Sequence, residues 1–379
     1  MRKILEINDL KHLARNKLPK MFYDYIDTGS YSGGTYKDNE EDLKKIKLKQ
    51  RVGVNIKNRA LATQILGIDY NLPLGLSPVG MGGMMYPKGE ILAAKAANEM
   101  NIPYILSTMS ICSIEQVAEN SNSPFWFQLY VMKDKEFVKN LILRAKKAKC
   151  SALVITMDLP LLAQRHNDIR NGLSAPPKLG FNQLLQLIKK PEWCLRMLAN
   201  KNKTFGNILG HVKGVKDLAS IASWTNEQFD QELTWDYVKW IMKLWGGPTI
   251  LKGILDLEDA QKSLDIGADA IIVSNHGGRQ LDGAPSSILE LNKISKLVGA
   301  KLEVYVDGGF RYGADVIKAK ALGARAIFIG RPYLYGLGAK GYEGVIDAIR
   351  IFEKEMDITL ALCGETNINN LSLKNIVEH

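Results

Sequence analysis

Eight short apolar runs, most of them separated by helical patterns, constrain the fold of this chain more than any other feature. Amphipathic stretches such as Gly89–Asn98 and Leu255–Asp265 lie between runs, which is the rhythm of repeated βα units. Eight units predict one closed (β/α)8 barrel, a TIM barrel, with residues 1–379 as one domain. The runs are Pro73–Pro78, Pro103–Ser107, Phe125–Tyr130, Leu153–Asp158, Thr249–Lys252, Ala270–Asn275, Glu303–Asp307 and Ala326–Gly330.

Two additions to the barrel are expected. Asn8 and Asp9 can cap a helix over Leu10–Asn16, and a second N-terminal helix is predicted over Met21–Asp27. About ninety residues separate the fourth run from the fifth, where a βα unit needs about thirty. The segment from about 170 to 232 is therefore interpreted as an insertion, either a lid or another functional loop.

Composition narrows the setting in which this barrel works. The chain has four cysteines and no CxxC pair, so we expect reduced thiols, a cytoplasmic location and no metal site. Neither a signal peptide nor an apolar run of about 18 residues is apparent. The net charge of +10 comes from scattered lysines, with no basic stripe interleaved with aromatics. Nucleic acid is therefore not an expected partner, whereas an anionic membrane surface remains one.

Polar and glycine-rich motifs stand at the C-terminal end of nearly every predicted strand. In a (β/α)8 barrel these ends converge on one face, where the chemistry takes place. The motifs are Ser77-Pro78-Val79-Gly80, Ser107, Gln128-Leu129-Tyr130, Thr156-Met157-Asp158, Lys252-Gly253, Ser274–Arg279, Asp307-Gly308-Gly309 and Gly330-Arg331.

The last two motifs predict a phosphate site. Glycines let the backbone approach a ligand closely, and Arg311 and Arg331 add positive charge. The alternative is that these glycines only make tight turns. Gly336, Gly338 and Gly341 also spell GxGxxG, but they do not follow a strand in an early βαβ unit, so we interpret them as allowing close helix packing.

Candidate catalytic groups occur at the same strand ends. Of the five histidines only His276 lies there, and Asp158 at another strand end can orient it and balance its charge. Arg165 and Arg279 follow two strands and suit a carboxylate substrate through bidentate hydrogen bonds. A structural histidine and surface salt bridges are the alternatives.

Five segments closely resemble the FMN-dependent L-2-hydroxy acid dehydrogenases and oxidases, the family of glycolate oxidase and flavocytochrome b2. The resemblance runs from about residue 5 to 365, and the segment around Met109 is similar to bacterial respiratory L-lactate dehydrogenases. The segments are SNHGGRQLDGAPSS (274–287), FQLYV (127–131), ILKGIL (250–255), DGGFRYGADV (307–316) and IGRP (329–332).

The resemblance implies a role for each site residue. His276 matches the catalytic base, Asp158 the carboxylate that stabilises it when protonated, and Tyr130 the tyrosine that hydrogen-bonds the reacting oxygen. Tyr25, Arg165 and Arg279 match substrate-binding residues, with the arginines on the carboxylate. Lys252 matches the lysine beside the flavin N1–O2 edge, where a positive charge stabilises the anionic reduced flavin. Other FMN contacts are implied for Val79, Gly80, Ser107, Gln128, Thr156, Asp307, Gly309, Arg311, Gly330 and Arg331.

The implied reaction is oxidation of an L-2-hydroxy acid, L-lactate to pyruvate first of all, with electrons passed to quinone or a cytochrome. The alternative is an oxidase that releases hydrogen peroxide. The chain has Pro78-Val79-Gly80 where oxidases of the family often have Pro-Thr-Ala, which favours the dehydrogenase. An FMN barrel isomerase or a non-catalytic binding module would not need His276, Asp158, Tyr130 and both arginines. Family members are usually homotetramers.

The insertion contains a basic amphipathic stretch at 181–203. Its apolar residues lie among five cations and one carboxylate, Glu192. Such a stretch with a tryptophan suits the surface of an anionic membrane, so peripheral contact with the cytoplasmic face of the inner membrane is one expectation. A lid over the barrel mouth or a contact with a neighbouring subunit is the other. The apolar residues are Phe181, Leu184, Leu185, Leu187, Ile188, Trp193, Leu195 and Leu198, and the cations are Lys189, Lys190, Arg196, Lys201 and Lys203.

Overall fold

Eight parallel strands form the barrel of this computed structural model, which describes residues 3–173, 180–198, 200, 202, 204–212 and 229–377. The strand order is β3-β10-β9-β8-β7-β6-β5-β4, and a parallel bridge between Leu76 and Tyr104 connects the two edges. The predicted (β/α)8 barrel is therefore confirmed. The strands are β3 (Leu74–Leu76), β4 (Ile105–Ser107), β5 (Trp126–Tyr130), β6 (Ala152–Thr156), β7 (Thr249–Ile254), β8 (Ala270–Val273), β9 (Glu303–Asp307) and β10 (Ala326–Ile329).

Inward-pointing side chains fill the barrel interior. The Trp126 ring lies 5.4 Å from Phe328 and 6.1 Å from Tyr305, between centroids. A hairpin of β1 (Thr63–Ile65) and β2 (Ile68–Tyr70) packs Ile65 against this cluster. This hairpin was not among the eight runs predicted from the sequence. The packed interior leaves chemistry to the strand ends.

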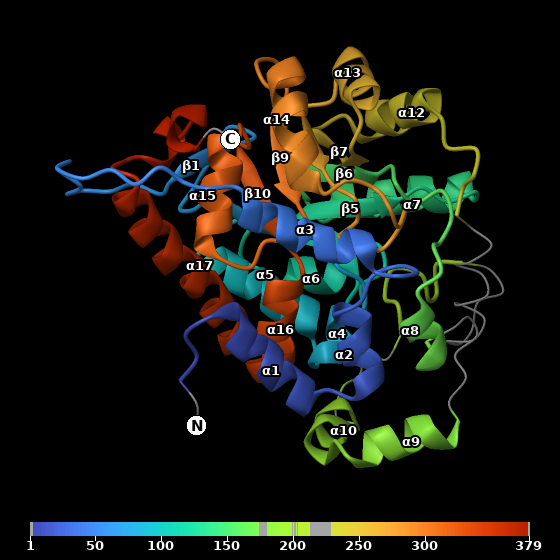
Figure 1. Cartoon of the computed structure of the whole chain (residues 1–379). Helices are drawn as coiled ribbons and strands as arrows, with labels where there is room; N and C mark the ends of the chain where they lie inside the picture. Colours follow the sequence, from blue (N-terminus) through green and yellow to red (C-terminus); the bar gives the residue numbers. More distant parts are fainter. Residues whose placement is uncertain are drawn as a thin grey trace.

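Helices surround the barrel (Figure 1). A Cβ at Gly336 would lie 2.0 Å from the carbonyl oxygen of Gly344 on the next helix, so the GxGxxG glycines do serve close helix packing. The helices are α4 (Gly82–Met85), α5 (Gly89–Glu99), α6 (Ile114–Asn120), α7 (Lys135–Lys147), α12 (Trp235–Trp245), α13 (Leu257–Asp265), α14 (Ser287–Val298), α15 (Gly313–Ala321), α16 (Arg331–Lys340) and α17 (Tyr342–Leu362), followed by the 3-10 turns η1 (Ile368–Asn370) and η2 (Leu373–Asn375).

Three N-terminal helices precede the barrel: α1 (Ile7–Lys17), α2 (Lys20–Ile26) and α3 (Gly34–Lys45). The expected cap of the first helix was wrong by one turn. The helix follows Glu6, and the Asp9 carboxylate instead accepts a hydrogen bond from the Leu5 amide at 3.0 Å. Segments α2 and α3 reach the strand-end face, where the Ser30 amide donates to the Gly278 carbonyl at 2.9 Å.

The chain between β6 and β7 contains α8 (His166–Arg170), α9 (Phe181–Ile188) and α10 (Pro191–Leu198). Figure 1 shows α9 and α10 at the lower edge, beside α2. Trp193 attaches them, because its ring lies 5.1 Å from that of Phe22 and its Nε1 donates to the Met84 carbonyl at 3.0 Å. Residues 174–179 and 213–228 of the predicted insertion lie outside the described residues, as do 199, 201 and 203. No helix in the described part of the chain is long and apolar enough to cross a membrane.

Candidate active site

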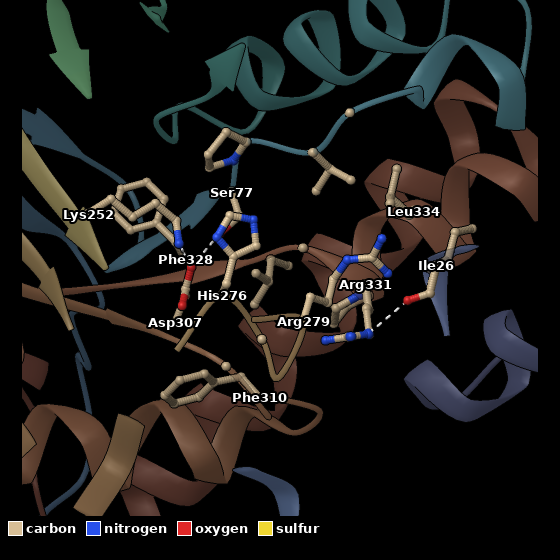
Figure 2. A pocket seen from close by; sticks show the side chains of 18 of the residues that line it. Ile26, Ser77, Lys252, His276, Arg279, Asp307, Phe310, Phe328, Arg331 and Leu334 are labelled. Atoms are coloured by element: carbon tan, nitrogen blue, oxygen red, sulfur yellow. Dashed lines mark hydrogen bonds and ion pairs between the residues drawn. The ribbon is translucent and has the colours of Figure 1, made fainter. Parts of the chain in front are cut away.

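A cleft with about 880 Å³ of empty space, part of it open to solvent, lies at the strand-end face (Figure 2). It brings together nearly all the predicted site residues, from the ends of seven strands and from the N-terminal segment. Asp158 and Ser107 lie directly behind it, in contact with His276 and Gln128. The predicted residues that line the cleft are Tyr25, Val79, Gly80, Gln128, Tyr130, Thr156, Arg165, Lys252, His276, Arg279, Asp307, Gly309, Arg311, Gly330 and Arg331.

His276 and Asp158 form a partly buried pair, with 2.9 Å between Nδ1 and Oδ1. Burial lowers the pKa of His276 below its ordinary value, although Asp158 opposes this. Burial alone would raise the pKa of Asp158, but the contacts with His276 and Lys252 lower it. At neutral pH the imidazole is thus neutral beside a carboxylate, with Nε2 free to take up a proton.

A glycine in β7 makes room for this carboxylate. Gly253 has φ +97° and lies where the β7–β8 register shifts. A Cβ at this position would lie 2.5 Å from the Asp158 Cγ. The Lys252-Gly253 motif therefore serves two partners, because the lysine faces the cleft and the glycine accommodates the partner of the histidine.

Arg165 and Arg279 create a positive region in the cleft. The buried Arg165 guanidinium has its pKa lowered to about 10 by desolvation and by Arg279. Arg279 stacks on the Tyr25 ring, 4.6 Å from its centroid, and its buried Nη2 has no hydrogen-bond partner among the described residues. Arg279 Nη2 lies 3.6 Å from Asp168 Oδ2, so this carboxylate offsets part of the positive charge, and burial raises the pKa of Asp168. Such a site selects an anion.

Tyr130 lies over the histidine. The two rings are nearly parallel at 6.4 Å, and Phe229 packs edge-on against the tyrosine at 5.9 Å. Burial is the main cause that raises the pKa of the Tyr130 phenol, and the neighbouring Tyr25 raises it further. The hydroxyl therefore stays protonated and can donate to a ligand oxygen.

A row of hydrogen bonds runs along the bottom of the cleft, at the C-terminal ends of the strands. Ser107 donates to Gln128 Oε1 at 3.0 Å, and Gln128 Nε2 donates to the Thr156 hydroxyl at 2.8 Å. On β7, Lys252 Nζ lies 2.8 Å from Asp307 Oδ2 and donates to Ser274 at 2.7 Å. This row offers amide, hydroxyl and ammonium groups to the edge of a flat heterocycle.

The β9 and β10 loops form the other end of the cleft. Gly308 and Gly309 have φ of +100° and +86°, and a Cβ at Gly309 would meet the Asn39 carbonyl at 2.1 Å. Arg331 is buried, and its Nε donates to the Ile26 carbonyl at 2.8 Å (Figure 2). Arg311 pairs with Glu40 at 2.8 Å, which reduces the charge it can offer.

The two ends together fit FMN. The row from Gln128 to Lys252 suits the ring edge, and the glycines and arginines suit a phosphate. Asp307 Oδ1 is buried with no hydrogen-bond partner in the described part of the chain, which leaves an acceptor for a hydroxyl of the linking chain. The residues that would hold FMN are those predicted from the resemblance.

Sequence reasoning missed several contributors. Asp168 and Glu40 pair with site arginines, and Asn39 contacts the β9 glycines. They lie within helices, so the strand-end rule could not identify them. The cleft is also lined by residues to which the sequence assigned no role: Ile26, Ser77, Pro78, Gly277, Gly308, Phe310, Phe328, Ile329, Pro332 and Leu334. Of these, Ser77, Pro78, Gly277 and Gly308 belong to the strand-end motifs that the sequence did point out.

Comparisons with known proteins agree with this geometry. An L-lactate dehydrogenase of Pseudomonas syringae pv. syringae is 42% identical over 376 residues, 99% of each chain, and one of Vibrio cholerae is 41% identical over 98% of each. The structure of the monotopic membrane protein (S)-mandelate dehydrogenase superposes with a TM-score of 0.95, at 33% identity and full coverage of both chains. A mandelate oxidase with (S)-4-hydroxymandelic acid gives 0.85, at 32% identity, covering 99% of this chain and 98% of the other.

The model of the family described as FMN-dependent dehydrogenase matches residues 14–378. The predicted FMN cofactor and the predicted oxidoreductase class are thereby confirmed. The chain belongs to the family of FMN-dependent dehydrogenases.

Proposed function

We propose that this enzyme oxidises an L-2-hydroxy acid, L-lactate in the first place, and passes the electrons to a respiratory carrier. The observation that carries the proposal is the contact of His276 with Asp158 at 2.9 Å, at one cleft with Arg165 and Arg279. A base and two guanidinium groups match the hydroxyl and the carboxylate of such a substrate. The similarity to proteins named L-lactate dehydrogenase supports lactate over larger acids.

In this proposal the arginines bind the carboxylate and so fix the orientation of the substrate. Arg279 Nη2, which has no hydrogen-bond partner among the described residues, and the Arg165 guanidinium provide the donors, and Asp168 balances part of their charge. The Tyr130 hydroxyl donates to the oxygen at C2. Orientation by three groups makes the site selective for one enantiomer.

His276 then takes up a proton of the hydroxy acid through Nε2, and the Asp158 carboxylate stabilises the imidazolium through Nδ1. FMN, when bound, would accept the two electrons and the second proton of the oxidation. The Lys252 ammonium, held by Asp307 and Ser274, provides positive charge at the ring edge. Enclosure of these groups strengthens their electrostatic interactions.

The test is anaerobic mixing of the yellow enzyme with L-lactate or D-lactate while the flavin absorbance is followed. L-lactate should bleach the flavin and D-lactate should not. Arg279→Lys should raise KM and lower the bleaching rate, because the charge remains but the bidentate geometry is lost. Equal bleaching by both enantiomers would exclude this arrangement of the substrate.

A separate assay identifies the acceptor. In air, a dehydrogenase should form little hydrogen peroxide and should reduce a quinone analogue quickly. The similarity to a mandelate oxidase structure supports the oxidase alternative. Peroxide formed in step with lactate consumption would establish the oxidase.

We also propose that α9 and α10 rest on an anionic membrane, which would bring the flavin close to quinone. Five aliphatic side chains of these short helices are 38% to 72% exposed, whereas Trp193 is turned inward. Lys189, Lys190 and Arg196 accompany them. The exposed residues are Leu184, Leu185, Ile188, Leu195 and Leu198.

Sedimentation with anionic vesicles at low salt, and release at high salt, tests this contact. Absence of binding at low ionic strength would leave a lid or subunit contact for this segment. A cytoplasmic, peripheral location and a homotetramer remain further parts of the proposal, and both rest on the family resemblance. Light scattering, with and without vesicles, measures the number of subunits.

A further inference from the structure

A reciprocal pair of side-chain amides lies behind the histidine. Asn39 Nδ2 donates to Asn275 Oδ1 at 2.9 Å, and Asn275 Nδ2 donates to Asn39 Oδ1 at 2.9 Å. Asn39 belongs to α3, 236 residues earlier in the chain, and the two residues are only 2% and 5% exposed. Buried amides satisfied by each other fix both side-chain orientations.

Asn275 in turn holds an unusual stretch of backbone. His276 has φ +59°, a left-handed conformation that a residue with a Cβ rarely adopts, and Gly277 and Gly278 follow at +63° and +72°. The Gly278 amide donates to Asn275 Oδ1 at 3.0 Å, and Asn275 Nδ2 donates to the Pro285 carbonyl at 3.0 Å. Asn275 therefore closes the turn that aims the imidazole.

Asn39 connects this turn to the rest of the site. Its Oδ1 also accepts from the Ser287 amide at 3.2 Å, at the start of α14. Its main chain lies against Gly309 in the β9 loop. A change in this side chain therefore acts on the His276 turn, although the residue does not line the cleft.

We propose that Asn39 is a positioning residue for the reaction, acting through Asn275 to hold His276 against Asp158. This inference rests on the proposed function only in assigning the proton transfer to His276. It extends the catalytic apparatus to an N-terminal helix that carries none of the groups in contact with substrate.

The test is Asn39→Asp, which keeps the shape and makes the donor depend on pH. Burial raises the pKa of a carboxyl group. When protonated, it donates O–H to Asn275 Oδ1 and accepts from Asn275 Nδ2, so the pair is restored. When ionised, it has no donor and places negative charge against Asn275 Oδ1. The charged groups on the elements packed around it are Lys37, Asp38, Glu40, Glu41, Asp42, Lys44 and Lys45 of α3, Glu290, Lys293 and Lys296 of α14, Asp307 and Arg311 of the β9 end, and His276.

The measured quantity is the rate of anaerobic flavin reduction by L-lactate per bound flavin, as a ratio of variant to wild type at each pH. The ratio cancels the titration of His276. It should be near one at about pH 5.5 and fall about tenfold or more by about pH 8.5, in kcat more than in KM, because a displaced base slows proton transfer without removing the arginines. A ratio that does not change with pH overturns the proposal.

Thr35→Val is the matched control. Thr35 is a buried residue of the same helix, its hydroxyl donates to the Ala284 carbonyl at 3.1 Å, and it accepts from the Gly283 amide at 2.8 Å. The variant loses hydrogen bonds between α3 and the same loop but leaves Asn275 alone. Its thermal midpoint should fall, while its reduction-rate ratio stays near one at every pH. A pH-dependent loss equal to that of Asn39→Asp would make the effect structural and overturn the proposal.

If Asn39→Asp does not fold, the Asn39→Ser variant tests the positioning role of Asn39. This variant should bind FMN, as flavin absorbance shows, and reduce about tenfold more slowly at all pH values. A wild-type rate overturns the proposal. A wild-type enzyme that L-lactate does not reduce contradicts the proposed function instead; the ratios are then measured with whichever 2-hydroxy acid reduces it.

Discussion

Charged side chains usually lie at the surface of a protein and large apolar ones inside. The strand-end cleft and the α9–α10 helices depart from this distribution in opposite directions. The cleft buries charged side chains, including Arg165, Arg279 and Arg331, and contacts join residues more than one hundred positions apart. The α9–α10 helices expose large aliphatic side chains and are attached through Trp193. Buried charge and exposed apolar surface both cost free energy in the isolated chain. The comparison teaches where each region would bind a partner: the anionic substrate proposed for the cleft and the membrane surface proposed for α9 and α10.

The largest effect that separates the two regions is expected from His276→Gln. The base is lost while the cleft keeps its shape, so flavin reduction should slow by several orders of magnitude with FMN still bound. Rapid-mixing absorbance measures the rate, and vesicle sedimentation should be unchanged. Near wild-type reduction would place the base elsewhere.

Gly253→Ala should have the next largest effect. The new methyl group meets the Asp158 carboxyl, and φ +97° strains any residue with a side chain. Displacement of the partner of His276 by about 1 Å costs about one hundredfold in rate. Gly267→Ala is a control, since it has φ +81° and nothing within 4 Å of an added Cβ; equal losses in both variants would assign the effect to strain alone.

The pH profile of the wild type gives a smaller effect. Because burial lowers the pKa of His276, the base is neutral at neutral pH. The reduction rate should therefore be flat at neutral pH and fall about tenfold per unit only below the ordinary imidazole value of about 6.5. A rate that falls already as pH drops from 8 to 7 would contradict this.

The smallest effect on chemistry is expected from changes in α10. Leu195→Glu with Leu198→Glu should abolish vesicle binding but change reduction of a soluble dye by less than about twofold, because these side chains lie outside the cleft. The control pair Leu289→Glu and Leu362→Glu alters similarly exposed leucines on α14 and α17. Loss of vesicle binding in the control would show that the effect is one of net charge.

The barrel could be predicted from the sequence because the apolar runs that form its strands are local signals. Each of the eight predicted runs overlaps a barrel strand, because strands buried on both faces are continuous runs of β-branched and aliphatic residues. The strand-end rule then identified His276, Asp158 and the phosphate-loop glycines. It failed for Glu40 and Asp168, because helix residues reach the site only through the path of the chain around the barrel.

By itself, therefore, the sequence determined the barrel, the face that holds the chemistry and, through resemblance, the FMN-dependent family. The tertiary structure alone decided that Asn39 meets Asn275, that Gly253 accommodates Asp158, and that α9 and α10 turn Trp193 inward and their leucines outward. The physical reason is the separation along the chain over which each interaction acts. Strand and turn preferences act over a few residues, whereas contacts between residues 236 positions apart exist only once the barrel has closed.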